Sequence, residues 1–395
     1  MAMPRIGIDV TAALTQGGGI GRYTRELVRA LAVAQKGASY DTPRFSLFSA
    51  RPPARMPVPD PLPTGADFTF LPAPVSEKWL YRLWYRLRLP IPVQLVTGPL
   101  DLFHSPDFVL PPTSGNIPTL LTVHDLSFVH FPDTFPKALV DYLNSVVPWS
   151  VERATHVVAD SQATKDDLVQ LWGVAEKKVT VLYSGVSRTY RPDIDVAATQ
   201  RVRERYGLEK RPYLLTVGTV QPRKNYQMLI RAFAAAAGDL PYDLAIAGGR
   251  GWLDDQMLNE AHKQGINDRV RFLGFVADED LPALYSGATL FLFPSLYEGF
   301  GLPVLEAMAC GVPVIMSNSS SLPEVGGNAV LPLPPDATDA WTGAISTLLR
   351  DTELRAQLQE AGLQRVRDFS WQKSAEVLLE LYAALLDKGA TSRHN

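Results

Sequence analysis

The chain has 395 residues, 46% of them hydrophobic and 20% charged, so it can bury large cores and is not expected to be disordered. Its net charge of −3 argues against a dedicated nucleic-acid-binding protein, and its single cysteine, Cys310, excludes a disulfide scaffold and a multi-cysteine zinc site. The first residues do not resemble a signal peptide, and no apolar run is long enough for a membrane span. We therefore expect a cytoplasmic protein of at least two domains.

Short apolar runs alternate with amphipathic stretches of helical periodicity along both halves of the chain. The runs are apolar on both faces, which is typical of a parallel sheet covered by helices. Strands are predicted at 5–10, 45–50, 101–104, 120–124, 156–159, 179–182, 213–217, 244–247, 270–273, 290–294 and 314–316. Helices are predicted at 21–34, 136–153, 164–172, 226–237, 253–263, 279–286 and 303–310, with a mostly helical end at 337–386.

A polar stretch without β periodicity, at 190–210, separates the two series of elements. We therefore predict an α/β fold with two doubly wound, Rossmann-like domains joined near residues 186–210. Ligands of such sheets bind beyond the carboxyl ends of the strands, so two facing domains would form a cleft between them.

A glycine-rich loop at 17–21 follows the first predicted strand and opens the first helix. Glycine lets the backbone approach a ligand closely, and a helix start offers free N–H groups, so contact with a phosphate or a sugar is one interpretation. A flexible turn is the other. The spacing of the glycines fits neither the Rossmann fingerprint nor a P-loop.

A His-Asp pair, His124-Asp125, directly follows an apolar strand and would face the cleft. His124 could donate to a sugar hydroxyl or to a developing charge, although a lone histidine is more often structural. His104 and His130 are the other histidine candidates, and no His, Asp or Glu spacing resembles a metal site.

Two adjacent cations, Arg223 and Lys224, lie in a predicted strand-to-helix turn. Arginine can bind two oxygens at once and lysine acts as a point charge, so the pair suits a diphosphate. A solvated basic loop is the alternative interpretation of the same residues.

A glycine-containing loop carries Glu298, and the helix that follows it carries Glu306 in its first turns. Free N–H groups near Leu302 and Val304 would favour an anion at the start of this helix. The apolar neighbours of Glu306 indicate a buried position where its carboxylate needs a partner, and the hydroxyl groups of a ribose would serve. An exposed Glu306 is the alternative.

Together these segments resemble the family 4 retaining glycosyltransferases, which have the GT-B fold. Glu298 and Glu306, with seven residues between them that include a glycine-proline segment, look like the family signature, and the glycine loop, His124-Asp125 and the Pro-Arg-Lys-Asn turn occur in the family's order. The resemblance covers nearly the whole chain. It implies an acceptor-side domain at 1–190, a donor-binding domain at 191–370, and a last helix at about 371–388 that packs back on the first domain.

The resemblance also implies the transfer of a glycosyl unit from a nucleoside diphosphate to a hydroxyl group. Arg223 and Lys224 would bind the diphosphate and stabilise it as it leaves, Glu298 would hold the donor sugar, Glu306 the ribose, and His124 would touch the sugar. Further donor contacts are expected at Gly18, Gly19, Gly218, Gly249, Arg250, Val276, Phe300, Gly301 and Leu302. Retaining members are thought to use front-face attack assisted by the leaving phosphate, so no protein nucleophile, metal or other cofactor is expected.

The His-Asp-Leu, Pro-Arg-Lys-Asn and Gly-Trp-Leu segments look like those of bacterial polysaccharide mannosyltransferases. This likeness implies mannose transfer from GDP-mannose to a saccharide or polyprenyl-linked acceptor in lipopolysaccharide or other cell-surface polysaccharide synthesis. Thr219 departs from the pattern, because many relatives carry arginine there, and Arg223 would take more of the charge. A UDP-sugar donor carrying glucose or N-acetylglucosamine is the alternative; a non-catalytic sugar-binding protein and a sugar-nucleotide epimerase are more distant ones.

The segment 78–88 carries four positive charges, from Lys78, Arg82, Arg86 and Arg88, interleaved with Trp and Tyr. This composition suits a bilayer interface, so peripheral contact with the inner face of the cytoplasmic membrane is expected, and no nucleic-acid contact. An ordinary surface helix packed on the sheet is the alternative. The Asp-x-Asp motif at 193–195 resembles a metal motif of another glycosyltransferase fold, but it sits in the polar linker and is interpreted as a coincidence.

Overall fold

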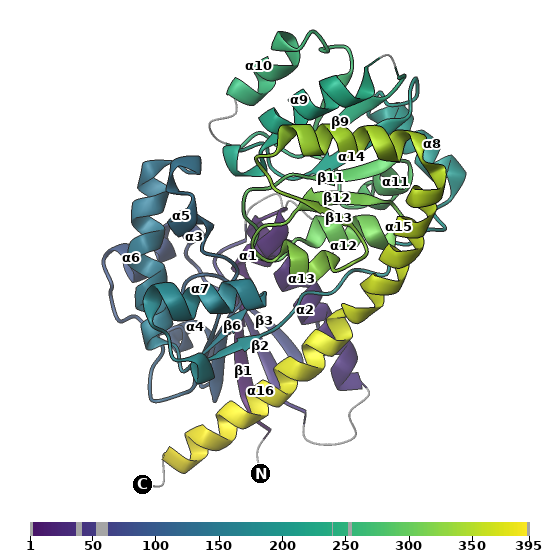
Figure 1. The fold of residues 1–395 in the computed structure, drawn as a ribbon. Coiled ribbons are helices and arrows are strands. Elements are labelled where there is room, and N and C mark those ends of the chain that lie inside the picture. Colours follow the sequence, from purple (N-terminus) through teal and green to yellow (C-terminus); the bar gives the residue numbers. More distant parts are fainter. Residues whose placement is uncertain (1–2, 37–41, 53–61, 239, 252–254, 393–395) are drawn as a thin grey trace. The chain divides into compact units, whose positions relative to one another are not determined.

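The structure is a computed structural model, which describes the chain except residues 1–2, 37–41, 53–61, 239, 252–254 and 393–395 (Figure 1). The chain forms two compact units. The first comprises Met1–Leu126, Asp141–Gly185 and Ser370–Asn395, and the second comprises Ser127–Val140 and Val186–Phe369. The second unit therefore includes a short segment that interrupts the first unit in sequence.

The first unit is built on a sheet of seven parallel strands in the order β3-β2-β1-β4-β5-β6-β7. The strands are β1 Arg5–Asp9, β2 Arg44–Ser49, β3 Phe68–Pro72, β4 Leu102–Ser105, β5 Thr119–Val123, β6 His156–Ala159 and β7 Val179–Val181. The central strands β4 and β5 are buried along their whole length, as expected for a parallel sheet covered on both faces. The sequence patterns do not predict β3, because most of its residues are exposed at the edge of the sheet.

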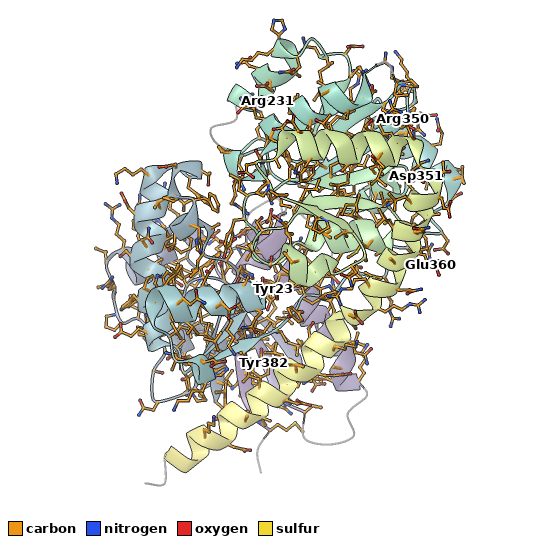
Figure 2. All side chains as sticks on the ribbon, viewed as in Figure 1. Tyr23, Arg231, Arg350, Asp351, Glu360 and Tyr382 are labelled. Atoms are coloured by element: carbon orange, nitrogen blue, oxygen red, sulfur yellow. The ribbon has the colours of Figure 1, made fainter. Side chains whose placement is uncertain are left out.

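The helices of the first unit end with α16, which packs against α2 and β4 (Figure 1). The hydroxyl of Tyr382 on α16 lies 2.7 Å from Nδ1 of His104, whose Nε2 lies 3.0 Å from Oγ1 of Thr122. This buried chain of hydrogen bonds ties α16 to the sheet and gives His104 a structural role. Tyr382 is labelled on α16 in Figure 2. The helices are α1 Thr11–Thr15, α2 Gly19–Lys36, α3 Glu77–Leu80, α4 Gln94–Thr97, α6 Lys137–Arg153 (whose first residues belong to the second unit), α7 Gln162–Trp172 and α16 Trp371–Ser392.

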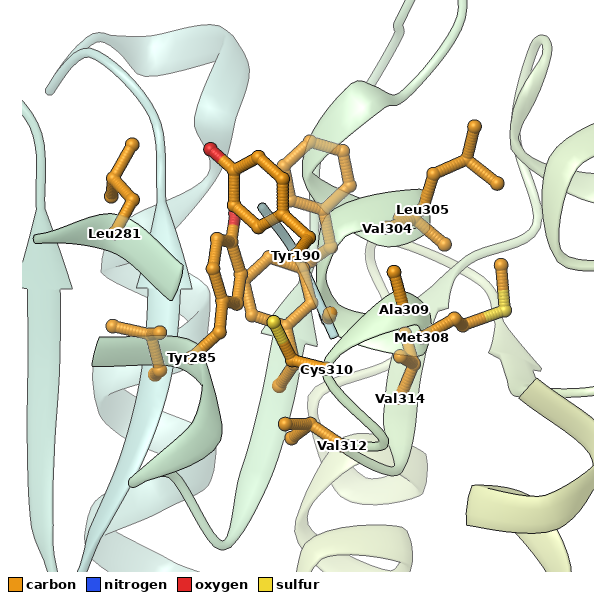
Figure 3. Packing of buried hydrophobic residues seen from close by; sticks show 14 of the residues in the cluster. Tyr190, Leu281, Tyr285, Val304, Leu305, Met308, Ala309, Cys310, Val312 and Val314 are labelled. Carbon is orange, nitrogen blue, oxygen red and sulfur yellow. The ribbon is translucent and has the colours of Figure 1, made fainter. Parts of the chain in front are cut away.

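The second unit contains six parallel strands in the order β10-β9-β8-β11-β12-β13. They are β8 Tyr213–Val217, β9 Asp243–Ala247, β10 Val270–Gly274, β11 Leu290–Phe293, β12 Val314–Ser317 and β13 Leu331–Leu333. Alternate residues of β11 face two cores, since Phe291 and Phe293 pack with one cluster and Leu290 and Leu292 with the other. Figure 3 shows part of the first cluster, around Tyr285. Because the two clusters take alternate residues of β11, both faces of this sheet are covered.

The helices of the second unit lie on both faces of its sheet (Figure 1). Residues of α11 and α12 contribute to the first core, and residues of α9 and α14 contribute to the second. The helices are α5 Ser127–His130, α8 Val196–Arg205, α9 Tyr226–Ala237, α10 Asp255–Lys263, α11 Leu281–Ser286, α12 Leu302–Ala309, α13 Leu322–Gly326, α14 Thr338–Arg350 and α15 Thr352–Arg365.

The predicted α/β fold with two doubly wound sheets is confirmed, and every predicted strand forms with small shifts at its ends. The polar stretch at 190–210 differs from the prediction because it contains α8. The carboxylate of Asp195 caps this helix by accepting a hydrogen bond from the N–H of Ala197 at 3.1 Å. Asp195 of the Asp-x-Asp motif therefore has a structural function.

Candidate active site

The predicted diphosphate-binding turn and the Glu298 loop meet at one position of the second sheet. The strand order reverses between β8 and β11, which are neighbours in the sheet. Arg223 and Lys224 follow β8, and Glu298 follows β11, so the fold brings these distant segments to the same carboxyl edge. Such a reversal point is where open α/β sheets bind their ligands.

The Arg-Lys turn is anchored to the end of β11 by its neighbours. Pro222–Lys224 form a short 3₁₀ turn, and Asn225, with a φ of 58°, adopts the left-handed conformation before α9 begins. The side-chain amide of Asn225 donates to the carbonyls of Pro294, at 3.2 Å, and Pro335, at 2.7 Å. These bonds fix the direction in which the two cations point.

Arg223, Lys224 and Glu298 form a buried ion triad. The Nζ of Lys224 lies 2.5 Å from Oε1 of Glu298, and Nη1 of Arg223 lies 3.1 Å from Oε2. Burial alone would raise the pKa of Glu298, but the charges of Lys224 and Arg223 outweigh it and hold the pKa at about 2. The carboxylate is therefore ionised at neutral pH, and the triad carries one net positive charge.

Serines that follow β12 hold the backbone of the Glu298 loop. The hydroxyl of Ser320 accepts from the N–H of Glu298 at 2.8 Å, and the hydroxyl of Ser321 bonds to the carbonyls of Glu298 and Phe300 at 2.9 and 2.8 Å. Ser320 itself has a left-handed backbone, with a φ of 49°, which is uncommon for a residue with a Cβ. The sequence analysis missed these residues, although a run of three serines after a strand is a detectable signal.

Glu306 is buried, with an exposed fraction of 2%, which confirms the predicted burial and excludes the alternative of an exposed side chain. Its Oε2 accepts a hydrogen bond from the hydroxyl of Tyr285 on α11 at 2.9 Å, a partner that the sequence analysis did not identify. Gly301, with a φ of 114°, lies just before α12, which begins at Leu302. The sequence predicts a free N–H group at Val304, but this group donates a hydrogen bond to the carbonyl of Gly301 at 2.9 Å.

The loop that follows β9 is held against the segment after β8. Val220 and Arg250 form a parallel bridge, and a Cβ on Gly248 would come within 2.0 Å of the carbonyl oxygen of Gly218. This close approach brings Gly249 and Arg250 next to the segment that leads into the Arg-Lys turn. Trp252 and Leu253 of the predicted Gly-Trp-Leu segment lie outside the described residues.

The predicted base contact Val276 has its side chain in the first core of the second unit. Only its main chain would therefore be offered to a ligand. The preceding residue, Phe275, is 60% exposed directly after β10 and was not singled out by the sequence analysis.

In the first unit, His124 follows β5 and both of its ring nitrogens have partners. Nδ1 lies 2.6 Å from Oδ2 of Asp160, and Nε2 lies 3.1 Å from the carbonyl oxygen of Pro106. Burial alone would lower the pKa of His124, but the Asp160 carboxylate outweighs it and raises the pKa to about 9. His124 is therefore a cation at neutral pH, clamped between two acceptors, and is not a free base.

Asp160 was missed by the sequence analysis, although it follows β6 in the same way that His124 follows β5. The rings of Tyr23 and Phe108 pack edge-on against His124, with centroids at 4.9 and 5.4 Å. These contacts fix the orientation of the imidazole.

Carboxylates gather where the strand order of the first sheet reverses, between β1 and β4. Asp9 ends β1 and Asp107 follows β4. Burial raises the pKa of Asp9 to about 6, opposed by hydrogen bonds from Thr11 and reinforced by the charges of Asp107 and Glu77. This edge of the first sheet is therefore rich in acidic groups.

The glycine loop lies at the same edge of the first unit. A Cβ on Gly18 or Gly19 would meet no atom within 4 Å, whereas a Cβ on Gly21 would lie 2.0 Å from the carbonyl oxygen of Gln16. Gly21 is therefore required for packing, and the exposed Gly18 and Gly19 have open space for a ligand.

The chain matches the model of "Glycosyltransferase Family 4" over residues 17–190 and the model of "Glycosyl transferases group 1" over residues 199–365. It is 33% identical over 371 residues to O-antigen chain mannosyltransferase B of Escherichia coli, in a match that covers 93% of this chain and 96% of that protein. The chain belongs to the family 4 glycosyltransferases. The serotype-specific mannosyltransferase WbdA of Escherichia coli is 30% identical over 72% of this chain, which spans only 36% of that longer relative.

Solved structures with low sequence identity share the GT-B fold of this glycosyltransferase. Sucrose-phosphate synthase from Thermosynechococcus elongatus matches with a TM-score of 0.75 and 23% identity, over 98% of this chain and 100% of that chain. WaaG, a glycosyltransferase involved in lipopolysaccharide biosynthesis, matches with a TM-score of 0.71 and 16% identity, over 95% and 99% of the two chains. The resemblance inferred from the motifs is thereby confirmed.

The basic aromatic segment of the glycosyltransferase forms α3 and a π-helical continuation, Tyr81–Arg86. Leu80 and Trp84 are buried, whereas Lys78, Arg82 and Arg86 are exposed. Arg88 is set apart from them, because its guanidinium lies 5.0 Å above the ring of Trp149 on α6. Among the helices that the structure describes, none has the length and apolar character to cross a membrane.

Proposed function

We propose that this glycosyltransferase moves mannose from GDP-mannose to a hydroxyl group of a saccharide or lipid-linked saccharide, with retention of configuration, during the synthesis of a cell-surface polysaccharide. The observation that carries the proposal is the Arg223–Lys224–Glu298 triad at the reversal point of the second sheet. The printed names of the relatives from Escherichia coli support mannose as the sugar and O-antigen as the kind of polysaccharide.

The triad suits a diphosphate that acquires negative charge as the glycosidic bond breaks. Arg223 and Lys224 are fixed in position before the ligand arrives, so they would stabilise the leaving group without reorganisation. The carboxylate of Glu298 neutralises one of the two positive charges. The same carboxylate would accept hydrogen bonds from the hydroxyl groups of the donor sugar, next to the bond that breaks.

The nucleoside would lie along the neighbouring segments of the second unit. Glu306, oriented by the hydroxyl of Tyr285, would accept hydrogen bonds from the ribose hydroxyls. The remaining donor contacts are assigned to the cation Arg250 and, for the other residues, mainly to backbone groups. These residues are Gly18, Gly19, Gly218, Gly249, Val276, Phe300, Gly301 and Leu302. No metal or other cofactor is part of this proposal, because Arg223 and Lys224 would bind the diphosphate and stabilise it as it leaves.

The acidic edge of the first unit supports a hydroxyl-rich acceptor over a phosphorylated one. Asp9 and Asp107 would accept hydrogen bonds from sugar hydroxyls, whereas a phosphate beside them would be repelled. His124, whose ring nitrogens are held by Asp160 and the carbonyl of Pro106, would contact the transferred sugar. In a front-face reaction, the leaving phosphate would take the acceptor proton.

A peripheral membrane contact would bring a lipid-linked acceptor to the site. The exposed cations Lys78, Arg82 and Arg86 lie beside Trp79, whose ring is 5.1 Å from the guanidinium of Arg82. We assign this surface to the inner face of the cytoplasmic membrane. The double variant Arg82→Glu/Arg86→Glu should bind anionic liposomes more weakly than the wild type does. Equal binding by the wild type and the double variant would contradict the assignment.

The donor is tested by thermal shift and by a transfer assay with GDP, UDP, GDP-mannose, UDP-glucose and UDP-N-acetylglucosamine. We expect GDP and GDP-mannose to raise the melting temperature of the protein and mannose to be transferred to a saccharide acceptor. Stabilisation by UDP compounds alone would support the UDP-sugar alternative. Stabilisation by sugars without any turnover would support a non-catalytic binding protein.

A further inference from the structure

A cavity of about 570 Å³ lies in the first unit at the amino end of β5, where Thr119 forms part of its wall. His124 follows the opposite end of the same strand, so the cavity and the acidic edge lie at opposite edges of the sheet. The volume falls within the range of small-molecule sites, about 300–1,000 Å³. The cavity is therefore large enough for a ligand and separate from the residues assigned to the acceptor.

The described residues that line the cavity include three cations and no acidic side chain. Arg88 precedes β4, Arg153 ends α6, and Lys388 lies near the end of α16. The rest of the wall is partly apolar, from Pro90, Leu110, Pro112, Ile117, Pro118 and Leu385, and partly polar, from Thr113, Asn116, Thr119 and Thr155. A ligand here would meet apolar side chains, neutral polar groups and three cations.

Arg153 is held rigidly at the cavity. Its Nη2 donates to the carbonyls of Leu110 at 3.0 Å and Pro111 at 3.1 Å, and its guanidinium lies 3.8 Å above the ring of Trp149. Its Nη1 is buried and has no hydrogen-bond partner among the described residues. Since an unpaired buried donor is costly, this atom is a candidate contact for a bound acceptor group.

Arg88 faces the same indole ring as Arg153, with its guanidinium 5.0 Å from the ring centroid of Trp149. The backbone of Arg88 has a φ of 51°. This left-handed conformation is unfavourable for any residue with a Cβ, and it is frequent in ligand clamps. Burial lowers the pKa of Arg153, Tyr85 opposes this effect, and the positive charge of Arg88 makes a smaller contribution that also lowers the pKa, consistent with repulsion between the two guanidinium groups. An anion between them would relieve that repulsion.

We propose that this cavity is a second ligand site, which binds a phosphate group through Arg88, Arg153 and Lys388. A phosphate monoester carries a charge of about −1.5 to −2 at neutral pH and offers three acceptor oxygens, which matches three cations better than a single carboxylate does. The inference is independent of the donor and acceptor assigned above, because the cavity shares no residue with them.

Two sources of the phosphate group fit the same chemistry. A small phosphorylated metabolite would fill the cavity itself. A phospholipid headgroup would enter from a bilayer, and the exposed side chains of Leu87 and Leu89, which flank Arg88, would then contact the acyl region.

The test uses calorimetric titration of the full-length protein with inorganic phosphate. Arg153→Met keeps the aliphatic stem, and Arg88→Asn keeps a residue that tolerates the left-handed backbone. Arg201→Gln, an exposed cation on α8 of the second unit, is the charge-matched control. Lys224→Met reports phosphate that binds at the triad instead.

We expect Arg153→Met to weaken phosphate binding about tenfold or more, the effect of one lost charge-assisted hydrogen bond, and Arg88→Asn to weaken it less. Arg201→Gln should leave phosphate binding unchanged, and Lys224→Met should remove only the phosphate that binds at the triad. Phosphate binding that Lys224→Met abolishes and Arg153→Met leaves intact would overturn the proposal, as would the absence of any binding to phosphate or anionic vesicles.

The source is distinguished by flotation with vesicles of phosphatidylcholine, with and without phosphatidylglycerol. Reduced recruitment of Arg153→Met to the anionic vesicles, relative to Arg201→Gln, would support a lipid headgroup. Unchanged recruitment combined with weaker phosphate binding would support a free phosphorylated ligand.

Discussion

The carboxyl edges of the two sheets have opposite chemistry at equivalent positions. At the reversal point of the first sheet, Asp9 and Asp107 are acidic, whereas at that of the second sheet, Arg223 and Lys224 form a cationic pair around Glu298. Both sheets follow the same doubly wound plan, so the fold determines where a ligand binds and the loop residues determine which ligand it is. We assign the cationic edge to the donor diphosphate and the acidic edge to the acceptor hydroxyls.

The largest effect is expected for removal of a cation from the second edge. Lys224→Met should lower kcat/KM for mannosyl transfer by about 10²–10³-fold, the range seen when one fixed group that stabilises developing charge is removed. Asp9→Asn, at the first edge, is the matched control and should leave nucleotide affinity unchanged. Steady-state kinetics with varied donor measure this difference, and a variant with wild-type kcat/KM would show that Lys224 does not stabilise the leaving group.

Glu298→Gln should separate stability from ligand binding. Removing one partner of a buried ion group leaves the other charges uncompensated. The free energy of unfolding should therefore fall by about 3–5 kcal/mol. The same change raises the positive charge of the triad, and GDP should therefore stabilise the variant more than it stabilises the wild type. Thermal melts with and without GDP provide both values. An equal GDP shift in the two proteins would contradict the opposing-charge account of the triad.

The pH dependence of stability tests the first edge. Because the pKa of His124 is raised to about 9 from an unfolded value near 6.5, its contribution to stability is complete below about pH 6.5 and is lost as the pH rises to 9. The loss should not exceed about 1.4 kcal/mol per pH unit. Chemical denaturation at pH 6.5, 7.5 and 9 measures it. His124→Gln should flatten this dependence, whereas His262→Gln, on the exposed side of α10, should not.

A smaller effect is expected for the residue that orients the predicted ribose ligand. Tyr285→Phe removes one hydrogen bond to Glu306 and should destabilise the protein by about 1 kcal/mol. It should also weaken GDP binding, but less than Glu306→Ala does. Calorimetric titration measures the affinity of the two variants for GDP. An unchanged affinity in Glu306→Ala would contradict the proposal that Glu306 binds the ribose.

The sequence predicts the strands of both sheets well because continuous apolar runs identify buried parallel strands. It does not predict β3, which is an exposed edge strand, or α8, whose polar surface has no apolar run. Candidate residues that lie just beyond a strand, such as His124 after β5 and Arg223 in the turn after β8, can be proposed from sequence order alone. Their partners Asp160 and Tyr285 come from other elements, and only the three-dimensional pairing identifies them.

Titration of GDP into the wild type, Lys224→Met and Asp9→Asn tests most directly whether the cationic edge is the donor side. The account predicts that Lys224→Met binds GDP at least about tenfold more weakly, as expected for one lost charge-assisted contact, and that Asp9→Asn binds it like the wild type. Wild-type affinity in Lys224→Met, or a comparable loss in Asp9→Asn, would contradict the assignment of donor and acceptor to the two edges.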